Sequence, residues 1–98
     1  MTHRYKTGET ILISCVVGNV VDFNLADVKF GFTNIELGEM VLKTPSVTGN
    51  ELNVTLESAD TKTAGAYLYE FWVIIGGIAD CVGEGYIVLR ESKMKEVI

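Results

Sequence analysis

The chain contains few of the side chains on which most enzymes and metalloproteins depend. Its 98 residues include one histidine, one proline, one tryptophan and two cysteines. The single histidine, His3, has no neighbouring metal ligands in the sequence. The sequence also shows no nucleophile next to a base, and no pair of carboxylates at a catalytic spacing. We therefore expect no catalytic residue, no bound metal or cofactor and no small-molecule substrate.

Basic residues are also scarce, with eight lysines and arginines against thirteen acidic residues and a net charge of −5. This balance argues against nucleic acid as a partner, because attraction to phosphates needs clustered lysine and arginine. The longest apolar run, Phe71–Ile75, is far shorter than the ~20 residues needed to cross a bilayer. The N-terminal residues show no secretory signal. We expect a soluble protein that is synthesised in a cytoplasm and has no membrane partner.

Cys15 and Cys81 are the two cysteines. Their separation is one that a disulfide of the immunoglobulin type could also show. In a cytoplasm, however, thiols stay reduced, and free cysteine is among the residue types most often buried. Two buried free thiols are therefore the preferred interpretation, with a disulfide as the alternative.

The composition is that of one ordinary globular domain, with 48% apolar and 21% charged residues. Apolar residues alternate with a period of two along the chain, and no ten-residue window sustains a helical period. We assign residues 1–92 to the domain and 93–98 to an exposed C-terminal tail. The alternation predicts strands over the ranges Thr10–Val17, Val28–Thr33, Glu39–Lys43, Leu52–Leu56 and Tyr67–Ile75.

The first of these strands has two partly apolar faces. Ile11, Ile13 and Cys15 share the face that we expect to point inward, whereas Leu12 and Val16 share the other. Leu12 and Val16, together with part of the strand Phe71–Ile75, are candidates for an outward apolar surface. Two interpretations of them remain open: they either form an apolar contact surface or lie under the loop formed by residues 22–26.

The strongest local prediction is a β-hairpin. Residues Tyr67–Ile75 are almost all aromatic or β-branched, which predicts a central strand buried on both faces with Trp72 in the core. Gly76 and Gly77 can adopt the positive φ angles of a tight turn. A returning strand would follow from Ile78 to Leu89, with a bulge at residues 83–85. The chain is therefore predicted to be an all-β, two-sheet antiparallel sandwich of about seven strands.

Between two of the strand signals lies a polar segment, residues 57–65, which we expect to cross from one sheet to the other. Asp60 and Thr61 are its most distinctive residues, because their short side chains can bond to backbone groups and close a turn. A structural role is the favoured interpretation, since no second carboxylate stands at a catalytic spacing.

Two segments resemble immunoglobulin-like domains. Residues Gly8–Cys15 resemble the second strand of those domains, and Thr63–Tyr69, which includes Gly65, resemble the corner before the sixth strand. The resemblance implies that the Tyr67 hydroxyl bonds back to the preceding loop. It departs from the antibody pattern at Tyr69, which occupies the position of the second cysteine.

A closer resemblance is to the small immunoglobulin-like domains of tailed-phage and prophage virion proteins, including the N-terminal domain of baseplate upper proteins. The matching segments are Gly8–Thr10, Asn24–Phe30, Leu56–Thr61, Gly65–Tyr69 and Gly85–Val88. The resemblance implies a structural protein of the phage tail, baseplate or capsid decoration. Its partners would be other virion proteins in a multi-copy assembly, and it would be located in the virion after synthesis in the host cytoplasm.

Exposed turns and edges are the expected contact regions, namely the edge strand 39–43, the loops 20–26 and 44–50, and the tail 91–98. Within them the candidate contact residues are Phe23, Glu39, Lys43, Asn50, Glu91 and Lys95. The alternative function is an adhesion module that binds a glycan or protein on the host surface. Such a module needs exposed loop aromatics, and Phe23 is the obvious one.

Overall fold

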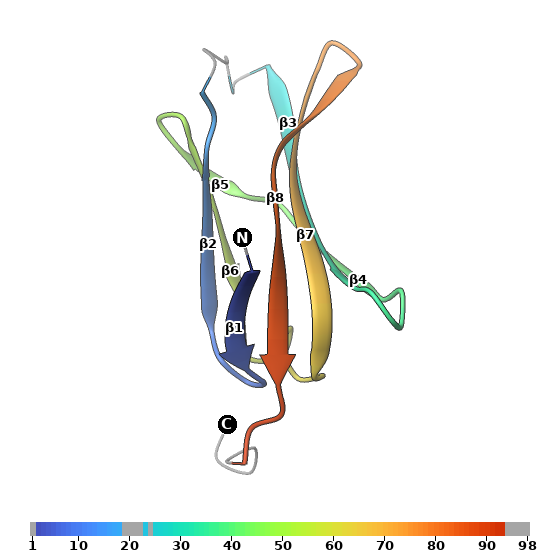
Figure 1. Ribbon diagram of the computed structural model, residues 1–98. Coiled ribbons are helices and arrows are strands. Elements are labelled where there is room, and N and C mark those ends of the chain that lie inside the picture. The colour runs from blue at the N-terminus through green and yellow to red at the C-terminus, as the bar shows by residue number, and fades with distance from the viewer. Residues whose placement is uncertain (1, 19–22, 24, 94–98) are drawn as a thin grey trace.

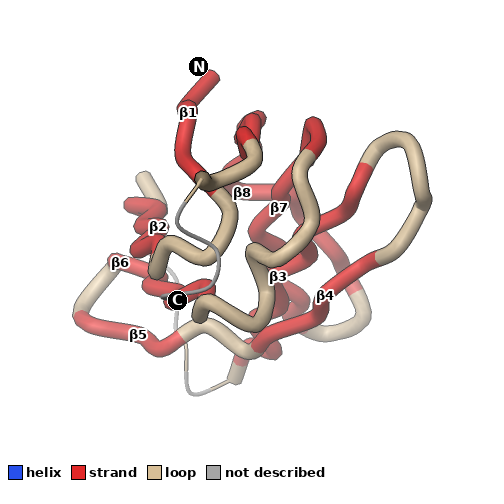
Figure 2. The backbone as a smooth tube through the Cα atoms, turned by 90° about the horizontal axis from the view of Figure 1, so that it is seen from below, coloured by secondary structure: helices blue, strands red, loops and turns tan. Residues whose placement is uncertain are grey.

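The computed structural model describes residues 2–18, 23 and 25–93, and every regular element in them is a β-strand. The strands form two sheets that face each other (Figures 1 and 2). The larger sheet has the order β1-β8-β7-β3-β4 and the smaller has the order β2-β6-β5. The strands are β1 (Thr2–Lys6), β2 (Ile11–Val16), β3 (Ala26–Asn34), β4 (Met40–Lys43), β5 (Ser46–Thr48), β6 (Glu51–Leu56), β7 (Gly65–Ile75) and β8 (Ile78–Arg90).

The prediction of an all-β, two-sheet fold is confirmed, but the details differ in two ways. The described residues form eight strands, because the N-terminal segment forms β1 and the expected loop 44–50 contains the short strand β5. The pairing is not wholly antiparallel, since β1 runs parallel to β8. The sequence of β1 alone could not show this parallel pairing, because the backbone of β1 pairs with Tyr86–Arg90, which are distant in the sequence.

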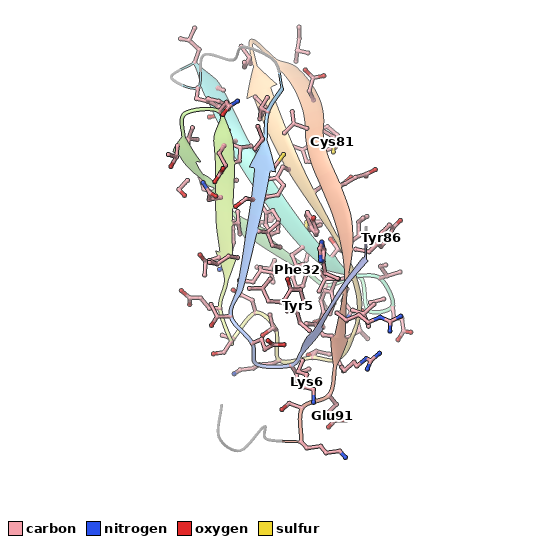
Figure 3. The ribbon with its side chains drawn as sticks, turned by 60° about the vertical axis from the view of Figure 1, so that its left-hand side comes forward. Tyr5, Lys6, Phe32, Cys81, Tyr86 and Glu91 are labelled. Carbon is pink, nitrogen blue, oxygen red and sulfur yellow. The ribbon has the colours of Figure 1, made fainter. Side chains whose placement is uncertain are left out.

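The core lies between the sheets and consists of inward-facing side chains from both. Phe32 stacks on Tyr67 with ring centroids 4.3 Å apart, and Phe30 packs against Phe71 at 4.9 Å. Figure 3 shows Phe32 between the two layers. The buried hydrophobic residues are Ile11, Ile13, Val17, Phe30, Phe32, Leu52, Val54, Leu56, Tyr67, Phe71, Val73, Ile87 and Leu89.

Alternation along β7 corrects the prediction that this strand is buried on both faces. Tyr67, Phe71 and Val73 point inward and are buried, whereas Trp72 points outward and is half-buried. The prediction of Trp72 as a core residue is therefore wrong. Hydrophobicity alone could not decide between the two adjacent aromatic residues, because the facing sheet covers only one side of the strand.

The β7–β8 hairpin has the predicted turn, with φ angles of 58° at Gly76 and 80° at Gly77. The bulge lies one residue earlier than predicted. Phe71 is paired with Gly83 and Trp72 with Cys81, so the extra residue in β8 is Val82.

Gly83 and Gly85 do not form the bulge, but the lack of a side chain at these two positions lets other residues approach β8 closely. A Cβ atom at Gly83 would lie 2.7 Å from the Cys15 sulfur, and one at Gly85 would lie 2.5 Å from the Tyr69 hydroxyl oxygen. Both separations are too short for a side chain to fit without movement of its neighbour.

Both cysteines are free. Cys15 is half-buried on the inner side of β2, where its thiol donates a 3.4 Å hydrogen bond to the Val82 carbonyl oxygen. Burial, and secondarily the nearby Cys81, raise the pKa of the Cys15 thiol. Cys81 is exposed, so the prediction of two buried thiols holds only in part.

Asp60 and Thr61 act structurally, as predicted. Thr61 is fully buried, and its hydroxyl donates a 2.8 Å hydrogen bond to the Glu9 carbonyl oxygen, tying the β6–β7 crossover to the β1–β2 turn. The Asp60 carboxylate accepts a 2.9 Å bond from the Glu57 N–H and lies 2.8 Å from the Lys43 ammonium. Partial burial opposes ionisation of Asp60, but the bond from Lys43, the Glu57 N–H and the charge of Lys43 together lower its pKa.

Two further hydrogen bonds connect the ends of strands to neighbouring segments. The Tyr67 hydroxyl donates a 2.7 Å hydrogen bond to the Thr63 carbonyl oxygen, which is the bond that the resemblance implied. Beyond β8, the Ser92 N–H donates a 2.9 Å bond to the Thr7 hydroxyl, so the chain remains attached to the domain through that residue. Gly65, which opens β7, has a φ angle of 146°, and a Cβ atom there would lie 3.2 Å from the Asn34 side chain.

Candidate contact face

The outward side of the five-stranded sheet presents several large apolar side chains to solvent. Even-numbered residues of β7 share it with residues of β3, β4 and β8 that the strand pairing places beside them. We call this surface the outer face. Its larger apolar members include Met40, Leu42, Leu68, Trp72, Ile74 and Tyr86, and its polar and charged members include Asp27, Lys29, Thr33, Glu70, Cys81 and Glu84, with Gly31 between the two kinds.

Large apolar side chains dominate the outer face. Leu42 is 72% exposed, Met40 57% and Tyr86 51%, while Leu68 and Trp72 beside them are half-buried. Figure 3 shows Tyr86 projecting from the side of the sheet that faces away from the other layer. Side chains this apolar at adjacent positions of one sheet form the kind of patch that marks protein–protein contact.

The outward side of the smaller sheet also carries exposed apolar side chains. Leu12 and Val16 on β2 are 75% and 63% exposed, so among the described residues no loop covers them. Between them Ser14 donates a 2.7 Å hydrogen bond to the Asn53 side chain, which breaks the apolar surface. Polar side chains therefore interrupt both outward surfaces, Ser14 and Asn53 on the smaller sheet and Glu70 and Glu84 on the outer face.

Two carboxylates and a thiol meet within the outer face. Glu70 on β7 is paired directly with Glu84 on β8, and Cys81 lies beside them. One ligand atom from each of the three residues falls within 4.8 Å of the others. Burial raises the pKa of the Cys81 thiol, a hydrogen bond with the Gly83 backbone lowers it, and the charges of Glu70 and Glu84 raise it, for a net increase.

Most of the predicted contact residues have intramolecular roles. Lys43 is bound to Asp60. Asn50 is exposed, but its side chain and its carbonyl oxygen both bond to Val17, which extends the pairing of β2. Phe23 is half-buried and packs against the core, so it is not the exposed loop aromatic that the adhesion alternative requires.

Of the other predicted contact residues, Glu39 and Glu91 do not form a common surface with Lys43, Asn50 and Phe23. Glu39 is exposed at the start of β4, where its carbonyl oxygen accepts a 2.8 Å bond from the Asn34 N–H. Glu91 is exposed after the end of β8. Lys95 and most of the predicted loop 20–26 lie outside the described residues.

The sequence pattern indicated part of Phe71–Ile75 as a possible outward apolar surface, but the predicted contact residues were placed in loops, an edge strand and the tail, so Met40, Leu42 and Tyr86 were not identified. The available signal was the alternation of Met40 and Leu42 in a short edge strand, which predicts two exposed apolar side chains on one side. The Glu70–Cys81–Glu84 cluster had no such signal. Cys81 and Glu84 are three residues apart in one strand, and strict alternation places them on opposite faces.

Comparisons with known proteins do not assign the chain to a family: no family model matches it, and the search of curated proteins found no significant match. Within the part of the chain that the structure describes, no helix is long and apolar enough to cross a membrane.

Proposed function

We propose that this chain is an immunoglobulin-like contact module of a phage particle, a tail, baseplate or capsid-decorating component that acts by binding other virion proteins. The finer fold assignment is supported by the order of the strands. In immunoglobulin-like sandwiches the second and fifth strands pair in one sheet, and the third, sixth and seventh pair in the other. Here β2 pairs with β6, and β7 lies between β3 and β8.

The bond from the Tyr67 hydroxyl to Thr63 supports the same assignment, because a tyrosine at this corner bonds to the backbone a few residues upstream in such domains. The assignment to a phage particle rests on the sequence resemblance of residues 5–90 to virion domains. Partner binding in many copies would provide avidity.

The outer face is the observation that carries the contact role. Leu42 and Tyr86 lie on the two sides of β7, whose outer-face residues Leu68 and Trp72 flank Glu70. A partner that covers these side chains removes them from water, at about 25 cal/mol per Å² of apolar area. The outer face is therefore the surface that we expect to be buried in the particle.

Particles produced from the genome that encodes this chain test the proposal. We expect antibody labelling and mass spectrometry to find the protein in gradient-purified particles. Leu42→Glu should prevent its incorporation, while Leu12→Glu, a matched change at an equally exposed leucine on the other sheet, should not. Urea unfolding of both variants must give similar free energies, so that a loss of incorporation reports contact.

Absence of the wild-type protein from particles would overturn the proposal. If Leu42→Glu and Leu12→Glu were incorporated equally, the result would contradict a contact role for the outer face. The adhesion alternative is tested with a glycan array. The contact module should give no signal, whereas specific glycan binding would favour the alternative.

A further inference from the structure

The cluster on the outer face joins two kinds of metal ligand. Glu70 and Glu84 each offer a carboxylate oxygen, Cys81 offers its sulfur, and the three ligand atoms lie within 4.8 Å of one another. We propose that Glu70, Cys81 and Glu84 bind a divalent metal ion of the zinc class. This inference is independent of the proposed function, since it requires neither a phage particle nor a protein partner.

The bulge in β8 brings the three ligands together. Glu84 faces Glu70, and Cys81 faces Trp72, which is two residues further along the same face of β7. If β8 were regular, with Val82 paired opposite Trp72, Cys81 would point to the core side of the strand. The bulge therefore turns the thiol outward, beside the two carboxylates.

The charges at the site favour a cation. Glu70 and Glu84 are directly opposite each other on adjacent strands, an arrangement that destabilises a sheet. Among the described residues no salt bridge joins either carboxylate to a basic group, and Lys29, the basic residue of β3 on this face, lies opposite Trp72 and not opposite Glu70. A bound divalent cation would replace the repulsion between the carboxylates with two attractions.

The thiol determines which cation the site selects. Thiolate sulfur is a soft ligand that suits zinc, cobalt and cadmium, whereas magnesium and calcium require oxygen ligands alone. In a tetrahedral zinc site, sulfur and oxygen ligands are about 3.5 Å apart. Glu84 and Cys81 are exposed, so their side chains can close that distance by rotation, and water would complete the coordination. Binding deprotonates the thiol, and the proton is released to solvent.

Titration of the reduced, purified protein with cadmium chloride tests the proposal. We expect one equivalent to produce ultraviolet thiolate-to-cadmium charge-transfer absorption and to change the fluorescence of Trp72, the cross-strand neighbour of Cys81. Zinc should displace cadmium, and magnesium should not. At a hundredfold excess over the Kd, zinc should raise the unfolding midpoint by about 10–20 °C.

Three variants assign the signal to the cluster. Cys81→Ser should abolish the absorption band, and Glu84→Gln should weaken cadmium binding at least about tenfold. Cys15→Ser, which removes the only other thiol, should retain the band, and Glu39→Gln should retain the affinity. The cluster is not a metal site if cadmium produces no band, if the band depends on Cys15, or if magnesium competes as well as zinc.

Discussion

On the inner face of β7, Tyr67, Phe71 and Val73 are buried against the opposite sheet, whereas on the outer face Leu68 and Trp72 remain half-exposed. Both faces carry aromatic and branched side chains, so hydrophobicity does not distinguish them. The difference comes from what lies opposite. The inner face has β2 and β6 across the core, and the outer face has no covering layer among the described residues. Inner-face positions should therefore determine stability, and outer-face positions should be free to determine contact.

The largest expected effect is at Phe71, which is fully buried. Phe71→Ala should reduce the free energy of unfolding by about 3–5 kcal/mol, because it leaves a cavity in the core. The neighbouring change Trp72→Ala should cost only about 1–2 kcal/mol. Urea denaturation measures the free energy of unfolding of both variants. If Phe71→Ala does not fold, Phe71→Leu replaces it in the comparison. Equal losses at the two positions would mean that the outer face is covered.

The second comparison concerns glycines of the two faces. Gly83→Ala should cost about 1–3 kcal/mol, because the new Cβ atom would meet the Cys15 sulfur at 2.7 Å. Adding Cys15→Ala should recover much of that loss. Gly31→Ala on the outer face, where the nearest atom is the Met40 sulfur at 3.5 Å, should stabilise the strand by up to about 1 kcal/mol. Additive effects of the Gly83 and Cys15 changes would contradict the contact.

The smallest expected effect separates two tyrosines. Tyr67→Phe removes the 2.7 Å bond to the Thr63 carbonyl oxygen and should cost about 1 kcal/mol. Tyr86→Phe, at an exposed outer-face ring, should change the unfolding free energy by less than about 0.5 kcal/mol. Thermal unfolding of the two variants in parallel provides the comparison. A larger loss at Tyr86 would show that its hydroxyl has a structural partner.

The sequence predicted features whose physical cause is local. Alternation in Leu52–Leu56 identifies the buried side of β6, and the paired glycines identify the β7–β8 turn, because each depends on residues adjacent in the chain. Features that depend on distant partners were not predictable. The strand β1 exists because β8 pairs with it, and the two faces of β7 differ because only one meets another sheet.

The candidate site was less predictable than the fold for the same reason. A single extra residue, Val82, decides which way Cys81 points, and glycine spacing placed the bulge one residue too late. The outer face depends on which strands are neighbours, and the order β8-β7-β3-β4 cannot be read from any one segment.

The parallel pairing of β1 with β8 has a consequence for how the protein is made. The bond that closes this end of the sheet, from Ser92 to Thr7, joins positions 85 residues apart. During synthesis on a ribosome the first strand emerges early and must wait, unpaired, until β8 has been translated. The five-stranded sheet can therefore be completed only after β8 has been translated, whereas the smaller sheet of β2, β6 and β5 has all its strands available earlier.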